Sequence, residues 1–287
     1  MTFFYVTGAG GFIGKKLCEA LSKLNASTVA YSRSSNFDAM PGVESRRVLD
    51  YREVRRTHDN AVCFHLAGVS APSEAEIQGA RLEKEALDVA EHFLKQGFSR
   101  IVFASSAVVY EDATEGMRKE SSPVRAHGAY VRMKLRLEEK MLASGHMVAR
   151  IANSYGPLRG KSNVVSDILK QLSGRGPVVL ENEFPVRDFI YISDVVRGLI
   201  ALSGGDEGGI YNLGTGKGNS IRALAEALLR LSGDSGRGVL SKAPRAEPSY
   251  LVLDSSKMKE RFGWKAEVGL EEGLGLLLEN QGVKNLS

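Results

Sequence analysis

Residues 3–14 read FFYVTGAGGFIG, and this stretch decides the fold of the chain. An apolar run comes first, a glycine-rich turn follows, and the apolar-periodic pattern of a helix continues from residue 12 to residue 24. Gly8, Gly11 and Gly14 form the GxxGxxG variant of a dinucleotide-binding loop. The first permits a tight turn, the second lets the backbone approach a pyrophosphate, and the third lets the helix pack on the strand. The alternative is a glycine-rich surface turn, which the strand–turn–helix context disfavours.

Short apolar runs alternate with helical patterns over the first two thirds of the chain. The runs are rich in Val, Ile and Phe without polar alternation, which is typical of strands buried on both faces. The alternation predicts an α/β fold, a Rossmann-like doubly wound parallel sheet covered by helices. The predicted strands are residues 3–7, 27–31, 45–49, 61–66, 100–104 and 146–151. The predicted helices are residues 12–24, a short piece after Asp50, 73–96 and 130–143.

The last third is richer in Gly, Ser and Pro, and its elements are shorter and more mixed. We expect a dinucleotide-binding domain at residues 1–155, to which the chain returns near 186–214. Residues 156–287 then form mainly a smaller α+β C-terminal substrate domain. Its predicted helices are 163–172, 193–202, 220–231, 255–262 and 270–280, and its predicted strands are 189–192 and 210–213.

The composition narrows the class of protein. The 287 residues suit about two domains. The formal charge is +4 and the pI about 9.0, but the Lys and Arg residues are spread along the chain, so we expect no nucleic-acid partner. A mild positive excess suits an anionic cofactor or substrate. No run approaches 18 apolar residues and the N-terminus lacks a basic region, so we expect no membrane span, no signal peptide and a cytoplasmic location.

The two cysteines, Cys18 and Cys63, fall in a helical pattern and in an apolar strand. Both are expected to be buried small hydrophobic residues. Because no CxxC motif or Cys/His cluster is present, no metal site is expected.

The end of the second predicted strand bears on the choice of cofactor. A site for NAD usually has a carboxylate there for the ribose hydroxyls, whereas this chain has Tyr31-Ser32-Arg33-Ser34-Ser35. Arg33 can meet a 2′-phosphate through charge-assisted bonds, and Ser32 can add a donor. We therefore predict NADP, with NAD as the alternative. Asp50, which closes the third strand, could accept from the adenine amino group or cap a helix.

Tyr130 and Lys134 are the candidate catalytic pair. They are one helical turn apart on the same face, roughly 6 Å from each other. An ammonium beside a phenol favours the phenolate, so Lys134 is expected to lower the pKa of Tyr130 and fit it for proton transfer. Ser105-Ser106 ends the strand before this helix, at the edge where a doubly wound sheet binds its ligand. Ser106 could share a carbonyl or hydroxyl of the substrate with Tyr130.

Taken together, the ordered motifs resemble the extended short-chain dehydrogenase/reductase family, in the branch that modifies nucleotide sugars. The motifs run nearly from end to end of the chain. They are TGxxGxxG at 7–14, HLAG at 65–68, SSAVVY at 105–110, YxxxK at 130–134, RxxNxYGP at 150–157, RDFIYIxDV at 187–195 and YNLG at 211–214.

The resemblance implies roles position by position. Ser106 matches the family's catalytic Ser/Thr, Tyr130 its general acid/base, and Lys134 the residue that binds the nicotinamide ribose. Asn153 would contact the sugar nucleotide, and Arg187 and Arg245 would grip its diphosphate or nucleotide; their alternative roles are capping and surface ion pairing. The cofactor contacts expected are Gly8, Gly11, Phe12, Ile13, Gly14, Ser32, Arg33, Asp50, Tyr51, Leu66, Ala67, Gly68, Tyr130 and Lys134.

Four residues depart from the family's usual pattern. Met133 replaces a small residue before the lysine, and Glu111 replaces the glycine after the Val-Tyr pair. Dehydratases of the family usually carry Asp-Glu after the catalytic Thr, where this chain has Ala107-Val108. That argues against dehydration and leaves ketone or alcohol chemistry at one carbon.

Three hypotheses follow. The first is a 4-ketoreductase that acts on a nucleoside-diphosphate 4-keto-6-deoxysugar, with NADPH as hydride donor and Tyr130 as proton donor. The second is a UDP-hexose 4-epimerase with tightly bound NAD, which uses the same catalytic residues. The third, a non-catalytic dinucleotide-sensing protein, is disfavoured because Ser106, Tyr130 and Lys134 are all present. The resemblance also implies a homodimer built from helices of the first domain.

Overall fold

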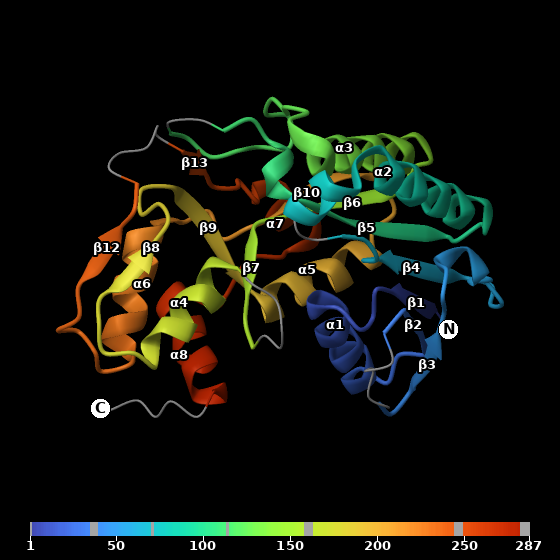
Figure 1. Ribbon diagram of the computed structural model, residues 1–287. Coiled ribbons are helices and arrows are strands. Elements are labelled where there is room, and N and C mark those ends of the chain that lie inside the picture. Colours follow the sequence, from blue (N-terminus) through green and yellow to red (C-terminus); the bar gives the residue numbers. More distant parts are fainter. Residues whose placement is uncertain are drawn as a thin grey trace.

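The computed structural model describes residues 2–34, 40–69, 72–112, 115–157, 163–243 and 249–281. Within these residues the predicted fold class is confirmed: a seven-stranded parallel sheet is covered by helices (Figure 1). The strand order is β10-β6-β5-β4-β1-β2-β3. Its strands are β1 (Phe3–Thr7), β2 (Thr28–Ser32), β3 (Val43–Arg47), β4 (Ala61–His65), β5 (Arg100–Ser106), β6 (Met147–Ile151) and β10 (Gly209–Leu213).

The order of the strands reverses between β1 and β4, which pair in parallel with Thr7 opposite His65. In a doubly wound sheet the ligand crevice opens at such a reversal, outside the carboxyl ends of the strands. All of β4 and the last three residues of β1 are buried, because helices cover both faces of the sheet. The fold therefore places the end of β1, and the glycine loop after it, at the expected crevice.

Helices cover the sheet on two faces (Figure 1). On one face α1 (Phe12–Lys23) packs against α5 (Ile192–Ser203), and on the other α2 (Pro72–Lys95) packs against α3 (Gly128–Ala143). The buried residues of α1 are Gly14, Leu17, Cys18 and Leu21, spaced three or four apart, so one stripe of this helix faces the sheet. The short helix α7 (Ser256–Phe262) lies beside β10.

The remaining elements form two smaller sheets and their helices. In the larger of the two, β9 (Val186–Tyr191) pairs with β7 (Asn153–Tyr155), β11 (Gly218–Ser220) and β13 (Tyr250–Leu251). In the other, β8 (Val178–Leu180) pairs with β12 (Val239–Ser241). The helices are α4 (Val164–Leu172), α6 (Ile221–Leu231) and α8 (Leu270–Asn280). Because β7 directly follows β6, this part of the molecule begins at the carboxyl edge of the large sheet.

Several predicted elements differ from the structure. The strand predicted at 45–49 is found as β3, two residues earlier, and most of it is exposed because β3 is the edge strand. The helix predicted at 73–96 has a kink at Gly79, whose φ of +52° is not helical. The short strands β7, β8, β11, β12 and β13 were not predicted. The two-domain division remains a prediction, although α5 and β10, in the 186–214 return, lie with the large sheet.

Other sequence expectations concern single residues and the membrane. Cys18 and Cys63 are both fully buried and unbridged, as predicted. Among the described residues, no helix combines the length and apolarity needed to cross a membrane.

Candidate active site

The glycine loop has the geometry that the sequence predicts. Gly8 has a φ of +71°, and a Cβ built on it would lie 2.9 Å from the backbone nitrogen of Ala67, so only glycine fits there. A Cβ on Gly14 would lie 2.2 Å from the carbonyl oxygen of Gly8, so a side chain at position 14 would push α1 off the loop. The loop thus packs directly against the end of β4 and against its own helix.

The start of α1 fits a pyrophosphate. Gly11 is the N-cap residue; no side chain caps the first turn and no acidic residue lies in it. The backbone N–H groups at this end, including those of Phe12 and Ile13, are therefore not satisfied by a cap, and the helix dipole favours an anion there. A dinucleotide would be held by this turn and by the glycine backbone.

Two residues that the prediction did not include hold the ends of β1 and β4 together. The Thr7 hydroxyl accepts a hydrogen bond from the Ala67 N–H at 3.2 Å and lies 3.0 Å from Nδ1 of His65. Burial lowers the pKa of His65 to about 3, so its ring is neutral. The HLAG motif provides the signal for this contact, because its histidine precedes the Leu66–Gly68 segment expected beside the cofactor.

The residues at the end of β2 surround the glycine loop. A Cβ on Gly10 would lie 2.5 Å from the Ser32 hydroxyl and 2.6 Å from that of Ser34, so these side chains lie directly against the loop. Arg33 is exposed, and its guanidinium carbon lies 5.7 Å from the ring centre of Tyr51. The Tyr51 hydroxyl in turn accepts a hydrogen bond from the Gly8 N–H at 3.1 Å. Arg33 and Tyr51 are therefore adjacent to the phosphate loop.

Asp50 has the capping role that was one of its two predicted roles. It is the N-cap of the 3-10 helix η1 (Tyr51–Glu53), where its Oδ1 accepts from the Arg52 N–H at 2.8 Å. Its carboxylate also pairs with the Arg52 guanidinium at 2.5 Å, and these bonds hold the pKa of Asp50 below its usual range. A contact between Asp50 and adenine remains a prediction.

The structure brings the three predicted catalytic side chains together. Tyr130 and Lys134 lie on the buried face of α3, and only 7% and 8% of their surfaces are exposed. The hydroxyl of Ser106, the last residue of β5, is close enough to the Tyr130 phenol to act as a hydrogen-bonding group that lowers its pKa. Lys134 Nζ donates to the Ala104 carbonyl at 2.8 Å and lies 5.8 Å from the Tyr130 ring centre. The arrangement can transfer a proton to an oxygen placed between Tyr130 and Ser106.

The sequence predicted that Lys134 lowers the pKa of Tyr130, and this prediction is wrong for the structure. Burial raises the pKa of the phenol above its ordinary value, and the hydrogen bond from Ser106 offsets this only in part. The Lys134 ammonium is itself buried, which lowers its pKa to about 8, and it is directed at the Ala104 carbonyl. Tyr130 is therefore a protonated phenol near neutral pH, which is the form that donates a proton.

Two of the predicted substrate-side residues, Asn153 and Arg187, lie on the second sheet. Asn153 is the first residue of β7, and Arg187 lies on the neighbouring strand β9. Arg187 Nη2 donates to the Ser249 hydroxyl at 2.6 Å, and the same guanidinium group lies 3.8 Å from Asp112. Arg187 thus already has an anionic partner, which a diphosphate would have to replace. Arg245 lies outside the described residues.

The two aspartates of the RDFIYIxDV motif have structural roles. Asp188 is buried and accepts hydrogen bonds from Thr215 N–H and O–H, the Gly216 N–H and the Leu253 N–H. Asp194 pairs with Arg197 at 2.6 Å. Because successive strand residues point to opposite faces, Asp188 anchors the turn after β10 while Arg187 faces Ser249.

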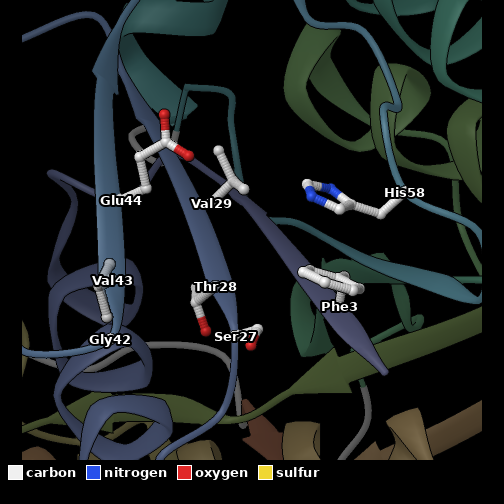
Figure 2. A pocket seen from close by; sticks show the side chains of 8 residues that line it. All are labelled: Phe3, Ser27, Thr28, Val29, Gly42, Val43, Glu44 and His58. Carbon is white, nitrogen blue, oxygen red and sulfur yellow. The ribbon is translucent and has the colours of Figure 1, made fainter. Parts of the chain in front are cut away.

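A hollow of about 380 Å³ opens elsewhere on the sheet (Figure 2). Its lining includes Phe3, Thr28 and Val43, which stand at the amino ends of β1, β2 and β3, and the rings of Phe3 and His58 stack there at 3.8 Å. The predicted site residues lie at the carboxyl ends of the strands, so this hollow is not the ligand crevice. Among the described residues no cluster of three His, Cys, Asp or Glu could hold a metal ion.

Comparison with known proteins identifies the family. The model of the NAD dependent epimerase/dehydratase family matches residues 4–214, and the chain belongs to this family. The resemblance to extended short-chain dehydrogenases/reductases that modify nucleotide sugars is thereby confirmed, as is the expectation of an enzyme of this type.

Individual relatives differ in the reaction they catalyse. The dTDP-4-dehydro-6-deoxyglucose reductase of Escherichia coli is 24% identical, over 96% of this chain and 96% of its own. The UDP-glucose 4-epimerase of Streptomyces lividans is 25% identical, over 91% of this chain and 90% of its own. The crystal structure of Thermotoga maritima UDP-glucose 4-epimerase with UDP-glucose superimposes with a TM-score of 0.86 at 24% identity, covering 98% of this chain and 99% of that one. These relatives leave the reaction undecided.

Proposed function

We propose that this enzyme reduces the 4-keto group of a nucleoside-diphosphate 4-keto-6-deoxysugar, with Tyr130 as the proton donor. The observation that carries the proposal is the buried Tyr130 phenol, which has the Ser106 hydroxyl as a hydrogen-bonding neighbour and the buried Lys134 one helical turn away. Burial keeps the phenol protonated, and a protonated donor is what the reduction of a ketone requires.

Tyr130, Ser106 and Lys134 each have a separate role in the proposed reaction. A bound reduced nicotinamide cofactor supplies the hydride that becomes the new C–H bond. Tyr130 gives its phenolic proton to the ketone oxygen, and the Ser106 hydroxyl donates a hydrogen bond that orients the same oxygen. Lys134 stabilises the phenolate that Tyr130 becomes. The ketone has then gained a hydride and a proton, and the product is the alcohol.

Two features favour NADPH as the hydride donor. Residues 31–34, the described residues at the end of β2, include no carboxylate, and exposed Arg33 lies next to Tyr51, which is bonded to the phosphate loop. An Arg so placed can meet a 2′-phosphate with charge-assisted bonds. The reductase from Escherichia coli, which matches nearly the whole chain, supports reduction as the reaction. Asn153 and Arg187, with Arg245, are the proposed contacts of the nucleotide sugar.

The second candidate is a UDP-hexose 4-epimerase that retains NAD. The epimerases among the relatives match the chain as fully as the reductase does, and the same three side chains would serve them. Homodimer formation and cytoplasmic location remain predictions for either candidate.

One assay separates the two candidates. Purified protein is given dTDP-4-keto-6-deoxyglucose with NADPH or NADH, and absorbance at 340 nm is followed; separate samples receive UDP-glucose or UDP-galactose without added cofactor. The proposal requires NADPH consumption with the keto sugar. Interconversion of the two UDP-hexoses without any consumption of NADPH would replace it by the epimerase.

A further inference from the structure

Three contacts join α3 to the last three residues of β5, Ala104–Ser106. Tyr130 meets the hydroxyl of the last residue, and Lys134 Nζ donates to the carbonyl oxygen of the first at 2.8 Å. Glu138, one turn further along α3, accepts a hydrogen bond from the hydroxyl of the middle residue. Residues four apart on a helix share one face, so a single face of α3 is bound to the strand that ends in Ser106.

Glu138 is a buried carboxylate held by a buried arginine. Its Oε2 lies 2.6 Å from Nη2 of Arg150, and each of the two side chains is only 4% exposed. Arg150 lies on β6 directly opposite Ser105 of β5, so both side chains reach α3 from the same face of the sheet. The carboxylate therefore ties two adjacent strands to the helix that carries Tyr130 and Lys134.

We propose that Glu138 is a positioning residue of the active site: bound to Ser105 and Arg150, it fixes Ser106 and Lys134 in register with Tyr130. The inference rests on the proposed catalytic roles of Ser106, Tyr130 and Lys134. Glu138 touches neither substrate nor cofactor in this account, and acts through Ser105 and through its charge.

The charge of Glu138 also acts on Lys134. Burial lowers the pKa of Lys134 to about 8, and the negative charge of Glu138 opposes this decrease. The other titratable groups facing the ammonium are Tyr130 on α3 and His65 on β4, which burial keeps neutral; Arg150 on β6 reaches this region through its ion pair with Glu138. Without Glu138, Lys134 would lose its proton at a lower pH, so a smaller fraction of it would carry the charge that stabilises the phenolate at neutral pH.

The test compares Glu138→Gln with Glu139→Gln, which removes the same charge from the exposed face of the same helix. The protein is labelled with [ε-¹³C]lysine, and the Lys134 signal, assigned with Lys134→Met, is titrated by NMR. We expect a midpoint near pH 8 in the parent and in Glu139→Gln. In Glu138→Gln we expect the midpoint to fall by about one pH unit. A folded Glu138→Gln protein whose Lys134 midpoint is unmoved would overturn the charge effect.

The positioning effect is tested with Ser105→Ala, which keeps the ion pair between Glu138 and Arg150 and so leaves no buried charge alone. We expect kcat for dTDP-4-keto-6-deoxyglucose to fall about tenfold, with the Kd of NADPH and the Lys134 midpoint unchanged, because the contact orients Ser106 and not the cofactor. Unchanged kcat would refute the positioning role. If Glu138→Gln does not fold, the kcat of Ser105→Ala alone decides whether Glu138 has a positioning role.

The experiments distinguish a failure of the proposed function from a failure of the proposed role of Glu138. If Tyr130→Phe retained full activity, the catalytic assignment would be wrong. The NMR titration of Lys134 would still report whether Glu138 controls its charge.

Discussion

Replacing Arg33 with alanine tests the residue on which the choice of cofactor depends. Arg33 is exposed and lies over the Tyr51 ring, next to the loop that Gly8 opens. Hydrogen bonds to a charged group contribute about 1.5–3 kcal/mol, and solvent exposure places Arg33 at the lower end of that range. About 1.5 kcal/mol corresponds to roughly a tenfold change in Kd. We therefore expect Arg33→Ala to weaken NADPH binding about tenfold and to leave NADH binding unchanged.

The assay is a fluorescence titration of each reduced dinucleotide at low and moderate ionic strength. A charge-assisted contact predicts that the difference between the parent and Arg33→Ala becomes smaller as salt is added. Arg46→Ala is the matched control: Arg46 also lies over a tyrosine ring, but its charge is already paired with Glu44 at 2.6 Å. Equal losses for NADPH and NADH, or no loss for either, would refute the reasoning and favour the NAD-dependent epimerase.

Three further predictions concern catalysis, packing and pH. Tyr130→Phe should lower kcat with the keto sugar by about 10²–10⁴-fold without changing the Kd of NADPH, because only the proton donor is lost; an unchanged kcat would show that Tyr130 is not the proton donor. Gly14→Ala should lower the Tm, because its Cβ would meet backbone at 2.2 Å and overpacking costs about 1–3 kcal/mol. The control is Gly275→Ala in α8, where a Cβ meets nothing within 4 Å, and this variant should not lower the Tm. The folded-state pKa of His65, about 3, lies below its ordinary 6.5, so the unfolded chain binds more protons between these values and stability falls as the pH decreases through that window. Urea unfolding should therefore show that the parent loses about 2 kcal/mol more than His65→Gln between pH 7 and pH 5, and equal losses in the two proteins would count against a buried neutral ring.

The sequence predicted the helices and strands most accurately where their position depends on neighbouring residues. The strand and helix around the glycine loop were placed within a residue of β1 and α1, because a tight turn and a helix start depend on neighbouring residues. β3 was misplaced because an edge strand is half-exposed and its apolar pattern is weak. The strands β7, β11 and β13 have two or three residues each and carry no periodicity at all; they exist because β9 lies beside them.

Within the site too, the sequence predicted what depends on local spacing and missed what depends on contacts across the fold. The sequence predicted that Ser106, Tyr130 and Lys134 would meet, because the helix fixes the spacing of two of them and the order of the strands places the third. It could not predict the direction of the Tyr130 pKa, which depends on how much of the phenol is removed from water. It also gave no sign that Asp50 pairs with Arg52, or that Arg187 already has Asp112 as a partner.

By itself the sequence determined the fold class, the enzyme family and the residues at the carboxyl edge of the sheet, because glycine spacing, helical spacing and apolar runs act over short stretches of chain. Only the tertiary structure decided which charges are buried and what they are paired with. The pair between Glu138 and Arg150 and its bond to Ser105 come from three different elements. Electrostatic energies depend on burial and on distances across the fold, and neither can be read from the order of residues.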